Sequence, residues 1–322
     1  MTIIIPHNHM KNNEILTILP ATKKLKSVRL PSSIDFSLEK DILKVTLSDV
    51  TGNMQENKSA FEGWIICFKS WLPLKIRKVE LEWVPPTDPT KKLHYNRFLF
   101  RVIQFQEMYS WFSVSEINFK TVQQFSKDML LDKWINYPLS GKLDSKSESK
   151  KEDKIESLFV NKYKPLLMNK LNLKTLNQQL PVGIFKGSVN SKNYFFTGQK
   201  SAIDLWGVNG CELSIFELKF ENKCIGIISE LLFYLYLSRA VFVTKEIKYP
   251  SKAENTKHRG FNKLYESNIQ KIKGYFLIDE LHPLIGKKAI NLLNAGLVNL
   301  GDLSVEKLKY KCIFGKQKLS WK

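Results

Sequence analysis

The chain has 322 residues, and 50 lysine and arginine residues against 31 aspartate and glutamate residues give it a formal charge of +19 at pH 7. With 43% hydrophobic residues it is expected to fold and bury cores, and its length allows two domains. The charge indicates a polyanionic partner such as nucleic acid, and the alternative is an AT-rich genome that enriches lysine, asparagine and isoleucine.

Several classes of protein are excluded by what the sequence lacks. The four cysteines are scattered without a CxxC pair, which argues against a zinc knuckle, a redox dithiol or a disulfide framework. No GxxxxGK[ST] or GxGxxG motif is present, and the five histidines suggest no zinc or hydrolase site. The N-terminus does not resemble a signal peptide, and the longest apolar run, 231–237, is far shorter than the ~20 residues of a membrane span. We therefore expect a cytoplasmic protein with no membrane partner.

Residues 1–140 are predicted to form a β-rich N-terminal domain of unknown role. Alternating or continuous apolar residues indicate strands, and these are expected at 42–47, 63–68, 75–83 and 98–103. Tryptophans interleaved with lysines and arginines would suit stacking on bases and contact with phosphates, and the alternative is a β-domain core with a solvated basic surface. The domain is predicted to bind a target or a partner protein.

The segment 141–153 is almost wholly charged or serine and is predicted to be a linker. Residues 154–322 then form a second domain. Apolar residues at helical spacing predict a helix over 154–171, which Pro165 would kink or split. The further elements expected are strands at 180–185 and 194–196, a hairpin at 203–219, a buried helix at 226–237, a strand at 275–278 and a helix at 287–295. This order predicts an α+β or α/β fold with a mixed β-sheet flanked by helices.

The hairpin carries the most informative residues of the chain. An Asn209-Gly210 pair between two apolar-rich runs predicts a two-residue type I′ turn, which pairs Val208 with Cys211 and Asp204 with Ile215. Side chains alternate between the two faces of a strand, so Asp204, Glu217 and Lys219 are predicted to share one face, with apolar residues on the other. The alternative for Glu217 and Lys219 is an ordinary solvated strand face.

This pattern, an Asp on the second strand and Glu-x-Lys on the third, resembles the PD-(D/E)XK nuclease superfamily, whose fold is that of restriction endonucleases. The resemblance covers roughly residues 154–295, and one departure is that Ile203, rather than proline, precedes Asp204. It implies that Asp204 and Glu217 hold Mg²⁺, for which Mn²⁺ can substitute. It also implies that the Leu218 carbonyl adds a third oxygen and that Lys219 orients or activates the attacking water.

The chemistry of these residue types agrees with the resemblance. Mg²⁺ prefers oxygen ligands and is commonly held by one or two carboxylates together with substrate phosphates. A lysine ammonium suits the stabilisation of charge on a phosphate. The resemblance also implies an acid in the first helix, for which Glu156 is the candidate. Glu230 is a candidate either for a supporting role at the site or for a structural ion pair.

Four more residues are candidates for nucleic-acid contact: Gln199, Lys200, His258 and Arg259. The sequence thus predicts a metal-dependent nuclease that acts on DNA in preference to RNA. Analogy with the superfamily suggests a subunit of a prokaryotic defence or mobile-element system, with a protein partner or a homodimer. The alternatives are a non-catalytic nucleic-acid-binding or scaffold protein that keeps the fold, and a nuclease that acts on RNA.

Overall fold

The computed structural model describes residues 12–20, 25, 28–138, 151–196, 201–249, 260–313 and 318–322. The chain divides into two compact units. The first contains the described residues up to Met129 together with Cys224–Ser229 and His282–Asn299, and the second contains Leu130–Lys223, Glu230–Leu281 and Leu300–Lys322. This division differs from the single predicted boundary at 141–153, because the first segment of the first unit already ends at Met129 and two later segments of the chain belong to the same unit. Of the predicted linker, residues 141–150 lie outside the described residues and 151–153 are helical.

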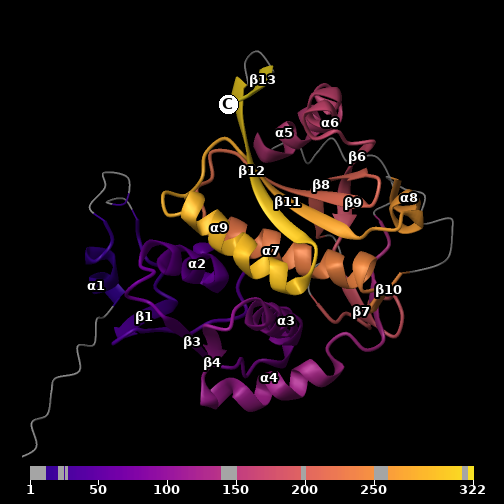
Figure 1. Cartoon of the computed structure of the whole chain (residues 1–322). Helices are drawn as coiled ribbons and strands as arrows, with labels where there is room; N and C mark the ends of the chain where they lie inside the picture. The colour runs from indigo at the N-terminus through magenta and orange to yellow at the C-terminus, as the bar shows by residue number, and fades with distance from the viewer. Residues whose placement is uncertain are drawn as a thin grey trace, which may run out of the picture. The chain divides into compact units, whose positions relative to one another are not determined.

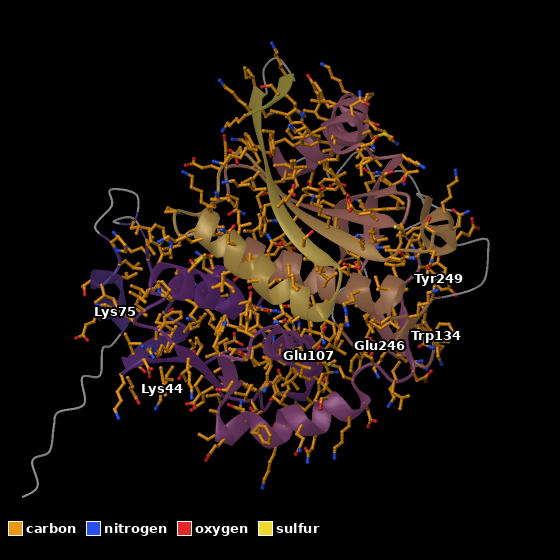
Figure 2. All side chains as sticks on the ribbon, viewed as in Figure 1. Lys44, Lys75, Glu107, Trp134, Glu246 and Tyr249 are labelled. Atoms are coloured by element: carbon orange, nitrogen blue, oxygen red, sulfur yellow. The ribbon has the colours of Figure 1, made fainter. Side chains whose placement is uncertain are left out.

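The first unit is an α/β structure. Its helices are α1 (Asn12–Thr17), α2 (Phe61–Trp71), α3 (Lys92–Met108), α4 (Glu116–Asp128) and α9 (Lys287–Leu297). Its strands are β1 (Ile34–Glu39), β2 (Ile42–Leu47), β3 (Lys78–Trp83) and β4 (Phe112–Val114). They form one sheet in the order β1-β2-β3-β4 (Figure 1), with an antiparallel β1–β2 hairpin followed by parallel pairs that α2 and α3 connect. At its surface, Lys44 of β2 forms an ion pair with Glu39 of β1 at 2.9 Å (Figure 2).

The prediction of a β-rich domain is therefore wrong in two places. Residues 63–68 lie in α2 and residues 98–103 lie in α3, whereas 42–47 is a strand as predicted and 75–83 contains β3. α2 is buried on nearly all sides, from Phe61 to Phe68, so its sequence shows a continuous apolar run without a helical period. Such a run does not distinguish a buried strand from a buried helix.

A buried ion pair links the helices of the first unit. Arg101 of α3 donates to both carboxylate oxygens of Glu62 on α2 and, at 3.2 Å, to the Ser59 carbonyl. The Ser229 hydroxyl donates to the same carboxylate at 2.7 Å. Arg101 and Glu62 are 2% and 0% exposed, so the bidentate geometry and the additional hydrogen bonds offset the cost of burying both charges.

The second unit contains the predicted hairpin. Its helices are α5 (Lys151–Val160), α6 (Lys164–Leu171), α8 (Phe261–Glu266) and the part of α7 (Gly226–Ser238) that begins at Glu230. Its strands are β5 (Lys133–Ile135), β6 (Thr175–Pro181), β7 (Ile184–Lys186), β8 (Ala202–Asn209), β9 (Glu212–Lys219), β10 (Ile247–Lys248), β11 (Lys271–Ile278), β12 (Leu303–Ile313) and β13 (Lys318–Trp321). β10, β5 and β7 form a small separate sheet; Figure 2 labels Trp134 of β5 and Tyr249, which follows β10.

The main sheet has the order β13-β12-β11-β9-β8-β6 (Figure 1). β6, β8 and β9 are antiparallel neighbours, and β11 is parallel to both β9 and β12. α7 connects β9 to β11, as a parallel pair requires a crossover. The prediction of a mixed sheet flanked by helices is confirmed. Pro165 splits the predicted first helix into α5 and α6, where it occupies the first turn of α6.

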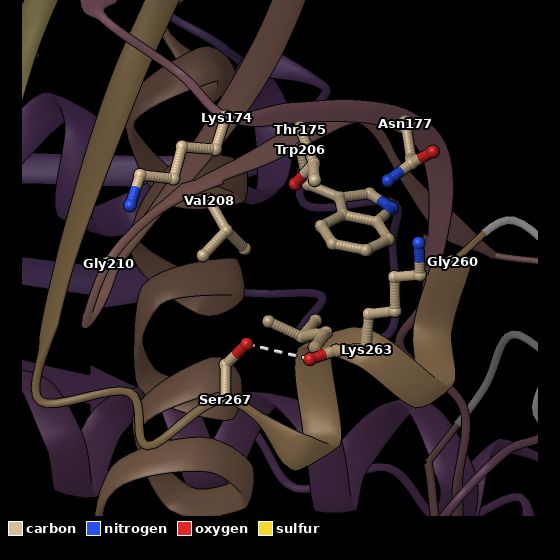
Figure 3. Close-up of a pocket in the computed structure, with 10 residues that line it drawn as sticks. Lys174, Thr175, Asn177, Trp206, Val208, Gly210, Gly260, Lys263 and Ser267 are labelled. Carbon is tan, nitrogen blue, oxygen red and sulfur yellow. Dashed lines mark hydrogen bonds between the residues drawn. The ribbon is translucent and has the colours of Figure 1, made fainter.

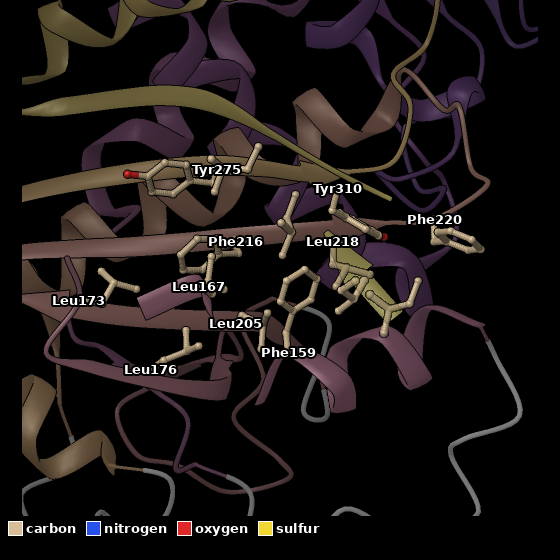
Figure 4. Close-up of a cluster of buried hydrophobic side chains, with 14 residues drawn as sticks. Phe159, Leu167, Leu173, Leu176, Leu205, Phe216, Leu218, Phe220, Tyr275 and Tyr310 are labelled. Atoms are coloured by element: carbon tan, nitrogen blue, oxygen red, sulfur yellow. The ribbon is translucent and has the colours of Figure 1, made fainter. Parts of the chain in front are cut away.

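Each face of the main sheet has its own cover. On one face α5 and α6 pack over a hydrophobic core (Figure 4), to which the sheet contributes Leu205, Phe216 and Leu218 and the helices contribute Phe159 and Leu167. On the opposite face, Gly274 of β11 allows α7 to come close, because a Cβ there would lie 3.2 Å from Leu231. Asp204, Glu217 and Lys219 alternate with the core residues and therefore belong to this second face.

In the part of the chain that the structure describes, one helical stretch, Gly226–Val243, has the length and apolar composition of a membrane span. Of its residues, 89% are buried inside the structure. The cytoplasmic location stays a prediction.

Candidate active site

The β8–β9 hairpin turns one residue later than predicted. Gly210 and Cys211 are the central residues, Asn209 pairs with Glu212, and Val208 pairs with Leu213 rather than Cys211. Gly210 has φ of +60° and Cys211 has no positive φ, so the turn has the pattern of type II′ rather than type I′. Each residue of β8 thus pairs two residues further along β9 than predicted. A shift of two residues preserves the faces, so the three polar residues still share one face.

Asp204 interrupts the ladder of the sheet on both sides. The β8–β9 pairing ends at Leu205–Phe216, and beyond it the Leu218 N–H donates to the Asp204 carboxylate at 3.0 Å. On the other side Gln179 of β6, which lies opposite Asp204, takes no part in the pairing and has a left-handed φ of 56°. The N–H and C=O of one strand residue point to the same neighbour, so the Leu218 carbonyl also faces β8.

Lys219 joins two of the buried acids. Its ammonium forms an ion pair with Glu217 on the same strand, and it lies 3.3 Å from the carboxylate of Glu230 on α7. Tyr310 belongs to the opposite face of the sheet, and its hydroxyl donates to the Lys219 carbonyl at 3.1 Å, which fixes the backbone of Lys219. The predicted Glu-x-Lys pair is therefore buried rather than a solvated strand face, and Glu230 belongs to the same cluster.

The structure adds two residues that sequence reasoning missed. The Tyr234 hydroxyl donates to Glu230 at 2.8 Å; the two residues are four apart on α7, the spacing at which helical side chains meet. From α5, Glu152 accepts a hydrogen bond from the Phe220 N–H at 3.3 Å, and its charge acts on both Asp204 and Lys219. Glu156, the predicted acid of this helix, lies half-buried one turn further along, and its role stays a prediction.

We use the name acid cluster for Asp204, Glu217, Glu230 and Glu152 with Lys219. Desolvation raises the pKa of Asp204 to about 6, against the opposing charge of Lys219. Burial, followed by the nearby Glu230 charge, raises the pKa of Glu217 well above its usual value. Burial alone would lower the pKa of Lys219, but Glu217 and Glu230 outweigh it and raise that pKa. Buried carboxylates thus outnumber the cation, and the cluster favours additional positive charge.

Three His, Cys, Asp or Glu side chains placed to hold a metal ion are not found among the described residues. The donor set that the resemblance implies is smaller, two carboxylates and one backbone carbonyl. It is compatible with the observed chemistry: the donors are all oxygens, and Oε2 of Glu217 is buried with no hydrogen-bond donor among the described residues. Mg²⁺ typically takes this number of protein ligands and completes its shell with water and phosphate.

Gln199, Lys200, His258 and Arg259, the predicted nucleic-acid contacts, lie outside the described residues. No known protein family matches the chain, and no characterised protein or solved structure shows significant similarity to it. Function must therefore be argued from the site itself.

Proposed function

We propose that the second unit is a Mg²⁺-dependent nuclease domain of the restriction-endonuclease-like fold, and that its substrate is DNA in preference to RNA. The observation that carries the proposal is the convergence of Asp204, Glu217 and Lys219 on one face of adjacent strands, with more buried carboxylate than cation. The element order supports it: helices α5 and α6, strands β6, β8 and β9, helix α7 and strand β11 follow the order on which the resemblance rests.

The central residues of the site have distinct roles in this proposal. Asp204, Glu217 and the Leu218 carbonyl would hold the ion. When bound, Mg²⁺ polarises a phosphoryl oxygen and lowers the pKa of a coordinated water. The ion would compensate the charge of Glu217, so the Lys219 ammonium would be released from that carboxylate to stabilise charge on the phosphate. Glu230, held by Tyr234, keeps Lys219 on the reacting side of β9.

A row of lysines supports a polyanionic substrate. Lys307 and Lys309 of β12 are exposed, and the pairing of β9, β11 and β12 places them in line with Glu217 and Lys219 respectively. Residues in line across a sheet share a face, so both lysines project from the face that carries the acid cluster. Lys311, also exposed, continues the row by the same alternation. Lysines at such positions neutralise phosphates without reading the sequence of the bases.

The test is a cleavage assay on the full chain with plasmid DNA, linear DNA and single-stranded RNA, each in Mg²⁺, Mn²⁺ or EDTA. We expect metal-dependent cleavage of DNA that Asp204→Asn and Glu217→Gln abolish. Glu212→Gln, the same change on the same strand but next to the turn, serves as the matched control and should leave cleavage intact.

Absence of cleavage in every metal, together with unchanged nucleic-acid binding by Asp204→Asn, would instead support a non-catalytic binding protein, and preferential cleavage of RNA would support the RNA alternative. Membership of a defence or mobile-element system, and a protein partner or homodimer, stay predictions.

A further inference from the structure

A second polar site lies on the same sheet face as the acid cluster. A pocket of about 270 Å³ opens between β6, β8 and the short helix α8 (Figure 3). Thr175 and Asn177 of β6 pair with Val208 and Trp206 of β8, so all four share the face to which Asp204 belongs. Trp206, which lines the pocket, follows Asp204 by two residues, so their backbones lie about 6.6 Å apart along β8.

The pocket has an unused hydrogen-bond donor. Trp206 is only 1% exposed, and its indole Nε1 is buried without a hydrogen-bond partner in the described part of the chain. A buried donor without an acceptor costs free energy, so such a group in a pocket suggests an acceptor supplied from outside. Figure 3 shows the indole nitrogen directed toward the side-chain nitrogens of Asn177 and Lys263. Three nitrogens thus surround one space.

The charge of the pocket is opposite to that of the acid cluster. Among the residues that the structure describes, Lys174 and Lys263 line the pocket, no acidic residue does, and neither lysine forms an ion pair. Ser267 is turned to its own helix, where its hydroxyl donates to the Lys263 carbonyl at 2.7 Å. The site therefore offers nitrogen donors and positive charge, a combination that selects an oxyanion.

We propose that this pocket binds the phosphate end of a nucleotide, either at the end of a nucleic-acid strand or on a free nucleotide, with Trp206 Nε1 and Lys263 as its donors. The strand form rests on the proposed nuclease function, because one strand would then meet both the pocket and the acid cluster. The binding itself is independent of catalysis, so the two proposals can fail separately.

The experiment follows the indole N–H resonance of Trp206 in ¹⁵N-tryptophan-labelled full-length protein in EDTA, assigned by its loss in Trp206→Phe. The probes are a 5′-phosphorylated hexanucleotide, the same hexanucleotide without phosphate, a nucleoside 5′-monophosphate and inorganic phosphate. We expect a downfield shift with the phosphorylated probes and none with the unphosphorylated strand. Tighter binding of the phosphorylated strand than of the monophosphate identifies the strand form, and the reverse identifies the free nucleotide.

The variants test the donors separately. Lys263→Gln should weaken the binding of the phosphorylated probes about tenfold or more, as expected for loss of a charged hydrogen bond. Trp206→Phe should weaken the binding of these probes about fivefold, as measured by calorimetry. Lys170 is an exposed lysine of α6, and Lys170→Gln should leave the binding unchanged. The proposal is overturned if the Trp206 resonance does not move with any phosphate probe, or moves equally with the unphosphorylated strand. Nuclease activity that is normal in Lys263→Gln while binding is lost overturns only the strand form.

Discussion

Lys219 lies two residues after Glu217 on β9 and forms an ion pair with it, although the two residues are only 4% and 1% exposed. The same ammonium lies 3.3 Å from Glu230. One cation therefore stabilises two buried carboxylates, with Asp204 and Glu152 close enough to influence its pKa. Removal of the cation leaves these carboxylates without a counter-charge, whereas removal of one acid relieves the excess of negative charge.

Lys219→Met is expected to lower the free energy of unfolding by about 3–5 kcal/mol at pH 8, because the change leaves buried carboxylates without their counter-charge. Urea unfolding in EDTA measures the loss, and Lys170→Met is the control. Millimolar Ca²⁺ should restore part of the stability by supplying positive charge. A loss below about 1 kcal/mol would mean that the cluster is solvated and that the ion pair contributes little.

Asp204→Asn is expected to change how stability depends on pH. Because folding raises the pKa of Asp204 from 3.8 to about 6, the folded state binds more protons between these values, and stability falls as pH rises through this window. The full penalty, up to about 3 kcal/mol, is present above pH 6. Asparagine can still accept from the Leu218 N–H but does not titrate. The difference in unfolding free energy between variant and wild type should therefore grow from pH 4 to pH 7, and a constant difference would contradict the prediction.

Divalent ions should stabilise the wild-type protein and not the Glu217→Gln variant. An ion that binds only the folded state, present at a concentration a hundred times its dissociation constant, raises the free energy of unfolding by about 2.7 kcal/mol. Thermal unfolding with increasing Mg²⁺ or Ca²⁺, and its reversal by EDTA, measures this effect. Glu212→Gln on the same strand should respond as wild type does. Equal stabilisation of all three proteins would show that the ions bind elsewhere.

The double variant Lys307→Gln/Lys309→Gln should bind nucleic acid more weakly, and the loss should not depend on the base sequence of the nucleic acid. If each lysine contacts one phosphate, the slope of log K against log salt concentration on duplex DNA falls in magnitude by about 0.9 for each residue. The control, Lys120→Gln/Lys127→Gln on exposed positions of α4, changes the net charge equally. Fluorescence anisotropy over a salt series separates the two, and identical slopes in both variants would mean that only net charge matters.

Gln179→Gly should stabilise the protein by about 1 kcal/mol, because Gln179 is held in the left-handed region that glycine adopts freely. The neighbouring change Gln178→Gly is the control. Gln178 pairs with Leu205 inside the ladder, so glycine there should destabilise. If Gln179→Gly is more stable but cleaves more slowly, the left-handed conformation of Gln179 opposite Asp204 contributes to activity at the expense of stability.

The site was predictable from sequence because its signals are local. Alternation along the hairpin assigns Asp204, Glu217 and Lys219 to one face, and an error of two residues in pairing leaves that assignment unchanged. The position of the turn was not predictable, since Asn209-Gly210 and Gly210-Cys211 both place a glycine where φ is positive, and the flanking strands choose between them.

Elements buried on more than one side were not predictable by the same means. α2 lacks a period because nearly every residue is buried. β12 changes its buried face midway: Leu303 and Val305 are buried on one face, and Leu308 and Tyr310 on the other, so no single alternation runs through it. Tyr234 and Glu152 join the site from helices whose orientation depends on tertiary packing, which the sequence does not show.

The division of the chain has a practical consequence for dissecting the protein. Residues 282–299 complete the first unit: α9 packs against α2, and Trp71 donates to the Leu284 carbonyl at 2.8 Å. No single cut can therefore separate the units. A truncation near residue 140 would remove α9 from the N-terminal fragment and leave it on the C-terminal fragment without α2, the helix against which it packs. During synthesis, too, the first unit has all its segments only after residue 299 has left the ribosome.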